Sequence, residues 1–313
     1  MKVPFNKAKQ YGWFALKVFI LALAFLFIYH KMATQKPLAW KGILDSFQLK
    51  NAGYFLLFMG FAIANWFFEI KKWQTMVSVL KKISFSEALT QSLAALTVSL
   101  ATPFRIGDYG AKAFYFEMQQ RKQILLLNLI SNAFQLFITL VFGSIGLWVS
   151  IPLLPLKPSG PTLVGFCCVL VVVLAIAHFY RKKEWFIKGF SIKNMWKNYQ
   201  KITVVVKRKA FAFSLLRYII FSSLFFMLLR FFGAATTFWE TIPFIWSMYL
   251  LASLLPVFSF FDVVIKSSIS VGLLSYLGIP EMVVLTTVVS MWLLNFIFPA
   301  VLGSVYVLNF KRI

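Results

Sequence analysis

Two pairs of oppositely charged residues stand inside apolar stretches of this chain. Asp108 precedes Lys112 by four residues, and Asp262 precedes Lys266 by the same interval. At that spacing an acid and a base lie on one face of a helix and can form a local ion pair. Ionisable side chains among membrane helices are costly and usually mark a functional site. The pairs therefore predict a site for a charged ligand; their alternative role is to neutralise each other at a helix break.

A proline divides the apolar stretch that contains each pair. Pro103 stands shortly before the first acid, and Pro256 shortly before the second. Proline removes a backbone donor and clashes with the preceding turn, so a helix ends at such a position. Gly107 adds conformational freedom after the first break. We expect two Pro-broken re-entrant hairpins, over residues 86–121 and 242–278.

The residue types in these hairpins indicate binding of an anionic head group. Arg105, Lys112 and Lys266 would contact the anion, assisted by backbone N–H groups where the second half-helices begin. Asp108 and Asp262 would hold these bases in place, or would alternate with the ligand as the partner of the bases. No cluster of His or Cys, no paired deep carboxylates in one motif and no metal-ligand spacing occurs in the sequence. We therefore expect neither an enzyme nor a metal or cofactor.

Amide side chains on a neighbouring span extend the predicted polar path. Asn128 and Asn132 share one face of the span that follows the first hairpin. Their alternative role is to form hydrogen bonds between helices without touching a substrate. Of the nine acidic residues in the chain, Glu69 is expected at the end of a span, and only Asp108 and Asp262 are expected to lie deep.

Composition predicts an all-α polytopic membrane protein. Sixty per cent of the residues are hydrophobic, 13% are charged, and the mean hydropathy is +0.80. Several apolar runs are long enough to cross about 30 Å of hydrocarbon. The net charge of +23 does not indicate nucleic acid, because the basic residues lie in short tracts between apolar runs. We expect six full spans, near residues 13–29, 54–68, 124–151, 162–180, 211–232 and 282–308.

The basic tracts orient these spans. If each hairpin begins and ends on one side, both termini and most of the 32 basic residues fall on the same side, which is then cytoplasmic. We expect an integral protein of the inner (cytoplasmic) membrane with both termini in the cytoplasm. Within one membrane domain, 1–313, residues 1–151 and 162–313 then form two repeats of inverted topology, a recurrent transporter design.

Residues 181–209 carry ten Lys or Arg and one acid. Ile192, Met195 and Tyr199 recur at helical spacing, while Lys193 and Lys197 mark another face. The pattern predicts a basic amphipathic helix on an anionic lipid surface. A solvated linker is the alternative interpretation.

Two motifs resemble a known family. The stretch TPFRIGDYGAKAF, residues 102–114, is similar to a signature of the lysylphosphatidylglycerol synthase transmembrane family, the flippase-like module of the multiple peptide resistance factor. PVFSFFDVVIKSS, residues 256–268, resembles that family's second signature, in which an acid and a base follow a proline. This chain has Phe104 where the family commonly has Gly, and Asp where Glu is usual. The resemblance implies movement of a lipid between leaflets, without the soluble synthase domain.

Three functional hypotheses follow. The first is a flippase for an anionic or aminoacylated lipid, with membrane lipids as partners. The second is a transporter for a polyprenyl-phosphate or lipid-linked sugar carrier, because the predicted site has an excess of positive charge. The third is a membrane scaffold that recruits a separate lipid-modifying enzyme, and a second copy of the chain is a further partner hypothesis.

Overall fold

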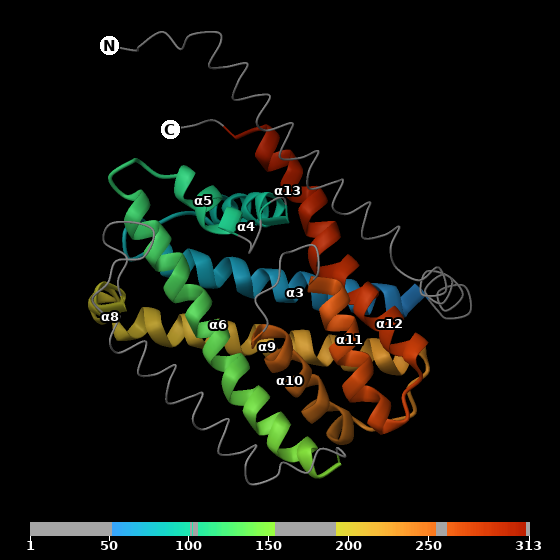
Figure 1. Cartoon of the computed structure of the whole chain (residues 1–313). Coiled ribbons are helices and arrows are strands. Elements are labelled where there is room, and N and C mark those ends of the chain that lie inside the picture. The colour runs from blue at the N-terminus through green and yellow to red at the C-terminus, as the bar shows by residue number, and fades with distance from the viewer. Residues whose placement is uncertain (1–51, 101, 103–105, 154–191, 255–261, 311–313) are drawn as a thin grey trace, which may run out of the picture.

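The computed structural model describes residues 52–100, 102, 106–153, 192–254 and 262–310 (Figure 1). Helices make up 87% of the described residues, and no strand occurs among them. The predicted all-α class is therefore confirmed. Pro103, Arg105 and Pro256 lie outside the described residues, as do the predicted spans at 13–29 and 162–180.

Four helical segments are long and apolar enough to cross a membrane: Gly53–Val77, Arg121–Leu153, Val204–Phe232 and Glu281–Leu308. The first three correspond to α3 (Ala52–Val77), α6 (Arg121–Ser150) with the 3-10 turn η2 (Ile151–Leu153), and α9 (Val204–Phe232). The fourth joins α12 (Glu281–Trp292), the π-helical turn η5 (Leu293–Ile297) and α13 (Phe298–Leu308). Large apolar side chains such as Leu56, Trp148 and Leu302 are exposed on these helices. Such an apolar surface is compatible with a membrane protein, in which lipid rather than water would cover it.

Two pairs of shorter helices overlap the two ranges that were predicted to form hairpins. The first pair is α4 (Phe85–Leu100) and α5 (Ile106–Phe114). The second is α10 (Phe238–Leu254) and α11 (Asp262–Leu274), followed by η4 (Ser275–Leu277). The helices of each pair pack against each other.

Matching capping motifs open α4 and α10. The backbone N–H of Ser84 donates to Glu87 Oε2 at 2.6 Å, and the Glu87 N–H donates to Ser84 Oγ at 3.1 Å. The backbone N–H of Thr237 donates to Glu240 Oε2 at 3.0 Å. These bonds satisfy backbone groups that a helix start leaves without partners. The backbone hydrogen bond from Ser84 also lowers the pKa of Glu87, and that from Thr237 lowers the pKa of Glu240.

Replacement of Ser84 by alanine tests the first cap. We expect Ser84→Ala to lower the free energy of unfolding by about 1 kcal/mol, measured by thermal unfolding in detergent. The Ser84 N–H bond needs ionised Glu87, whose pKa is lowered in the folded chain. Its contribution is therefore present above the unfolded-state pKa and lost as the pH falls through the folded-state pKa. Ser86→Ala, at an exposed neighbouring position, is the matched control, and an equal loss in both variants would contradict the assignment.

The helices pack in reciprocal pairs. Helix α3 lies along α9, α4 packs against α13, and α6 packs against α10 (Figure 1). Glycine permits two of these contacts. A Cβ on Gly146 of α6 would lie 2.5 Å from the Pro243 carbonyl oxygen, and one on Gly303 of α13 would collide with the Leu93 carbonyl. Thr97 also donates to the Ala300 carbonyl at 2.9 Å across the α4–α13 contact.

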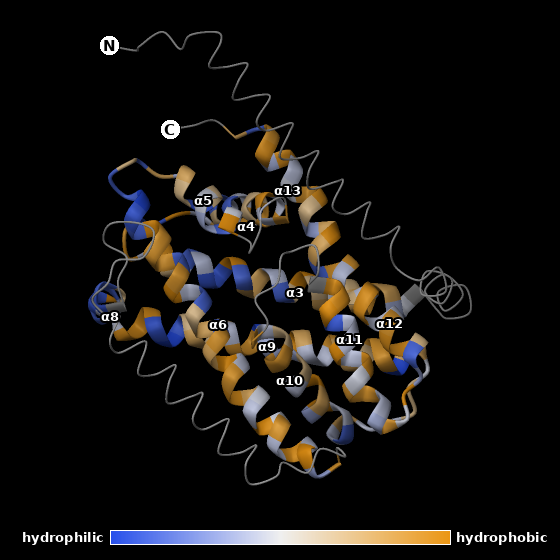
Figure 2. Cartoon of the chain, viewed as in Figure 1, coloured by the Kyte–Doolittle hydropathy of each residue, from blue (hydrophilic) through white to orange (hydrophobic). Residues whose placement is uncertain are grey.

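Three basic tracts lie at one end of the bundle: residues 71–82, 121–122 and 193–209. One buried cluster joins the ends of α3, α6 and α9 to α8 (Ile192–Lys201). It contains Met76 of α3, Leu127 of α6, Ala210 of α9 and Ile202, which directly follows α8. Hydrophilic residues are concentrated at this end in Figure 2. Tyr199 of α8 packs on the same cluster. The protein itself therefore covers part of the apolar face of α8, which was predicted to contact lipid.

Candidate functional site

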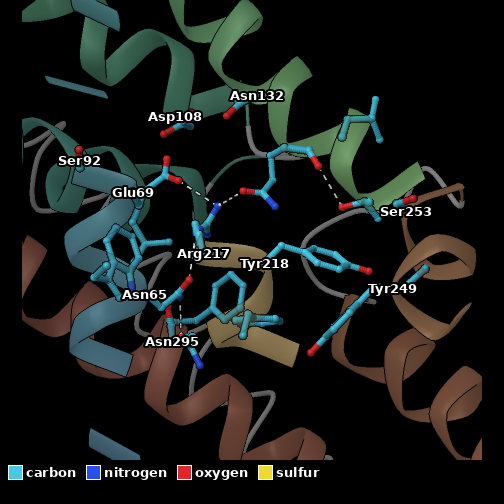
Figure 3. Close-up of a pocket in the computed structure, with 18 of the residues that line it drawn as sticks. Asn65, Glu69, Ser92, Asp108, Asn132, Arg217, Tyr218, Tyr249, Ser253 and Asn295 are labelled. Carbon is cyan, nitrogen blue, oxygen red and sulfur yellow. Dashed lines mark hydrogen bonds and ion pairs between the residues drawn. The ribbon is translucent and has the colours of Figure 1, made fainter. Parts of the chain in front are cut away.

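A cavity of about 490 Å³ lies between the hairpin helices and the long helices. Its wall combines charged, amide, hydroxyl and aromatic side chains (Figure 3). The lining residues are Asn65, Trp66, Glu69, Ser92, Leu96, Asp108, Tyr109, Lys112, Asn132, Gln135, Leu136, Thr139, Arg217, Tyr218, Phe221, Tyr249, Ala252, Ser253, Lys266, Asn295 and Phe296.

The first predicted ion pair forms part of this wall. Lys112 Nζ lies 3.1 Å from Asp108 Oδ1 and donates to Asn128 Oδ1 at 3.0 Å. Asn128 Nδ2 donates in turn to Asp108 Oδ2 at 2.8 Å. Lys112 is 3% exposed, and its ammonium lies 4.7 Å from the ring centre of Trp73. Because each polar group of this triad has a partner, a buried lysine is tolerated here.

The other predicted residues on this side are also placed. Asn132 Nδ2 donates to the Tyr109 hydroxyl at 3.0 Å, and both side chains line the cavity. Gly107 is buried and its N–H donates to Thr102 Oγ1 at 2.8 Å. A Cβ at Gly107 would lie 2.6 Å from the Val98 carbonyl oxygen. Glycine is needed there because the start of α5 approaches the end of α4 so closely.

Lys266 brings the second hairpin to the cavity. Its ammonium lies 5.6 Å from the ring centre of Phe296, and both residues line the wall. Asp262 is the first residue of α11, but its side chain lies outside the described part of the structure. The predicted pairing of Asp262 with Lys266 therefore stays a prediction.

A second charged centre was not predicted from the sequence. Glu69 Oε2 lies 2.7 Å from Lys72 Nζ and 2.9 Å from Arg217 Nη1. Arg217 also donates from Nε to Asn65 Oδ1 at 3.1 Å and from Nη1 to Gln135 Oε1 at 3.4 Å. The expectation that Glu69 ends a span is wrong, because α3 continues through it to Val77 and its side chain is only 12% exposed.

Asparagines join this centre to the last span. Asn65 Nδ2 donates to Asn295 Oδ1 at 2.8 Å, and Trp66 Nε1 donates to the Asn295 carbonyl at 3.1 Å. Asn295 lies in the π-helical turn η5. Such turns are often retained at functional sites, since they shift a side chain and free backbone groups.

Several hydroxyl groups along the cavity have no hydrogen-bond partner among the described residues. Ser92 Oγ and the hydroxyls of Tyr218 and Tyr249 belong to this set. Ser92 is 3% exposed and Tyr218 is 4% exposed. Buried polar groups normally have a partner, so these hydroxyls favour a polar molecule in the cavity.

Positive charge exceeds negative charge at the cavity. Among the described residues that line it, the bases are Lys112, Arg217 and Lys266, and the acids are Glu69 and Asp108. The described residues contain no group of three His, Cys, Asp or Glu side chains that could hold a metal ion. The arrangement is suited to binding an anionic or zwitterionic group.

Comparison with models of protein families, with curated proteins and with solved structures finds no match.

Proposed function

We propose that this chain is a membrane transporter that moves a lipid with a charged head group between the two leaflets. The observation that carries the proposal is a cavity of about 490 Å³, lined by five charged side chains, inside a bundle of apolar helices. Maintaining buried charges is costly unless they are paired or used. A head group would occupy the polar cavity, while its acyl chains stay in the hydrocarbon beside the helices.

Reciprocal packing supports an inverted repeat, which is part of the proposal. The first hairpin helix of each half packs on the last span of the other half, α4 on α13 and α10 on α6. The capping residues Ser84 and Thr237 both stand 19 residues before a proline. Lys112 and Lys266 occupy corresponding second hairpin helices. In this arrangement, six spans surround hairpins that open from opposite faces, as alternating access requires.

We further propose an orientation in the membrane and a family for this chain. The end of the bundle that contains α8 would face the cytoplasm, because the basic tracts gather there. Exposed Trp196 with Lys193 and Lys197 would contact anionic lipid at that surface. Membership of the lysylphosphatidylglycerol synthase transmembrane family agrees with transport and rests on the two motifs described above.

Lipid exchange in proteoliposomes tests the function. Vesicles that contain the full chain and a trace of acyl-labelled fluorescent lipid are treated with dithionite, which bleaches only the outer leaflet. We expect the wild-type chain to expose the inner-leaflet label. Lys266→Met should slow this exchange roughly tenfold or more, because a lost charged contact of about 1.5–3 kcal/mol corresponds to at least that factor.

Lys209→Met is the matched control, since Lys209 is exposed at the start of α9 and does not line the cavity. Insertion of every variant is checked by size-exclusion chromatography. If the wild-type chain moves no labelled anionic, zwitterionic, aminoacylated or polyprenyl-phosphate lipid, transport is excluded and a scaffold role takes its place. Equal rates for Lys266→Met and wild type would remove the cavity from the mechanism.

A further inference from the structure

Arg217 is the most accessible cation of the Glu69 centre. Its side chain is 28% exposed, compared with 1% for Lys72. It lines the cavity (Figure 3). Nε and Nη1 donate to described residues, whereas Nη2 has no hydrogen-bond acceptor among them. A guanidinium is a planar fork of five donors that matches the oxygens of a phosphate. Arg217 can therefore offer a new pair of donors to the cavity.

Glu69 can release Arg217 without becoming an unpaired charge. The same oxygen, Oε2, contacts both Lys72 Nζ and Arg217 Nη1, at 2.7 and 2.9 Å. Lys72 is buried, and its only ion-pair partner among the described residues is Glu69. Removing one partner of a buried pair is strongly unfavourable. Lys72 consequently keeps Glu69 in place when Arg217 turns to another anion.

We infer that Arg217 binds the phosphate of an anionic head group, and that Glu69 is its internal competitor. The carboxylate gives up Arg217 when a phosphate arrives and takes it back when the phosphate leaves. The inference rests on the proposed lipid transport and narrows the cargo to a phosphate-bearing lipid of net negative charge. A lysyl head group adds positive charge to a cavity that already has an excess of it, so it is disfavoured.

Two features of the wall fit the same ligand class. Lys112 and Lys266 line the cavity with Arg217 and supply further positive charge. The buried hydroxyls of Ser92 and Tyr218 have no partner among the described residues, and they can bind phosphate oxygens or the hydroxyls of a polyol. Phosphate oxygens accept several charge-assisted hydrogen bonds at once, which a carboxylate on the protein can imitate only in part.

Binding measurements with the full chain in neutral detergent test the inference. The probes are short-chain phosphatidylglycerol, a polyprenyl monophosphate, lysyl-phosphatidylglycerol, inorganic phosphate and diacylglycerol, titrated against tryptophan fluorescence. We expect both phosphate-bearing anionic lipids to bind, and diacylglycerol, which has no phosphate, to give no response. Arg217→Gln should weaken their binding at least tenfold, about the value of one lost charged hydrogen bond.

A double variant supplies a result that misfolding cannot imitate. Glu69→Gln combined with Lys72→Met removes the competitor and its counter-charge together, so the net charge of the cavity region is unchanged. We expect it to bind phosphatidylglycerol roughly tenfold more tightly, because Arg217 no longer has to leave a carboxylate. Arg230→Gln is the matched control: Arg230 lies on the same helix, is exposed, and donates to the Ala234 carbonyl away from the cavity.

Unchanged affinity in both Arg217→Gln and the Glu69→Gln, Lys72→Met variant would overturn the inference. Tighter binding of lysyl-phosphatidylglycerol than of phosphatidylglycerol would also overturn it. Inorganic phosphate that binds as tightly as the lipids would overturn it too and would assign the site to a soluble anion. Comparing the affinity for phosphatidylglycerol with the affinity for polyprenyl monophosphate identifies which of the two lipid classes the site prefers. If phosphatidylglycerol binds at Arg217 but no lipid crosses the vesicle bilayer, the transport proposal fails and this inference stands. If lipids cross but binding ignores Arg217 and Glu69, only this inference fails.

Discussion

Replacing Glu69 alone by glutamine destabilises the folded chain by about 3–5 kcal/mol, the typical effect of breaking a buried ion pair. Lys72 is the reason. Its side chain is fully buried within α3, and Glu69 is its only ion-pair partner among the described residues. A neutral amide cannot balance the ammonium, so the folded state must bury a charge or deprotonate it. Arg217 contributes less to the loss, because it is partly exposed and keeps Asn65 and Gln135 as acceptors.

Unfolding in detergent, followed by tryptophan fluorescence, measures this effect. Adding Lys72→Met to Glu69→Gln should recover most of the lost stability, since replacing both members of a buried pair by uncharged groups of similar size is often neutral. Lys71→Met is the matched control on the same turn. Lys71 is not buried, so we expect its replacement to change the free energy of unfolding by less than about 1 kcal/mol. A single Glu69→Gln variant as stable as the double one would show that Lys72 needs no counter-charge.

Local patterns explain what the sequence predicted correctly. Apolar length predicted long apolar helices, since crossing hydrocarbon requires such runs, and the described residues contain four helical segments of that length. The four-residue interval between Asp108 and Lys112 predicted an ion pair that the structure contains, since one helix places both side chains on one face. The matching intervals from Ser84 to Glu87 and from Thr237 to Glu240 are equally local. They are visible in the sequence as helix-start signals.

The second charged centre was missed because its partners are far apart in the chain. Arg217 meets Asn65 and Glu69 only where α9 lies along α3, and Asn295 reaches Asn65 from the last span. No spacing rule connects such positions. Glu69 was expected at a helix end because lysines follow it, yet α3 continues past them. A usable signal existed in Ile70, Trp73 and Val77, whose helical spacing marks a buried face beyond Glu69.

Neutralising the Asp108–Lys112 pair separates its two proposed roles. In the wild-type chain, Asn128 donates to Asp108 at 2.8 Å. In the variant with Asp108→Asn and Lys112→Met together, the new amide at position 108 retains an oxygen that can accept this bond. Methionine replaces the lysine stem beside Trp73. We therefore expect a folded chain with stability close to that of wild type. If the pair serves the head group, lipid exchange in proteoliposomes should fall at least tenfold, the effect of losing about 1.4 kcal/mol of charged contact in the rate-limiting step.

Glu117→Gln with Lys122→Met provides the matched pair of substitutions. Glu117 lies between α5 and α6 and Lys122 in the first turn of α6; both are exposed and neither lines the cavity. That variant should exchange lipid at the wild-type rate. If the variant with Asp108→Asn and Lys112→Met also exchanges lipid at the wild-type rate, Asp108 and Lys112 only neutralise each other at the helix break. The head group would then have to be bound by Arg217 and Lys266. Loss of exchange in the folded cavity variant alone would show that transport requires the charges themselves.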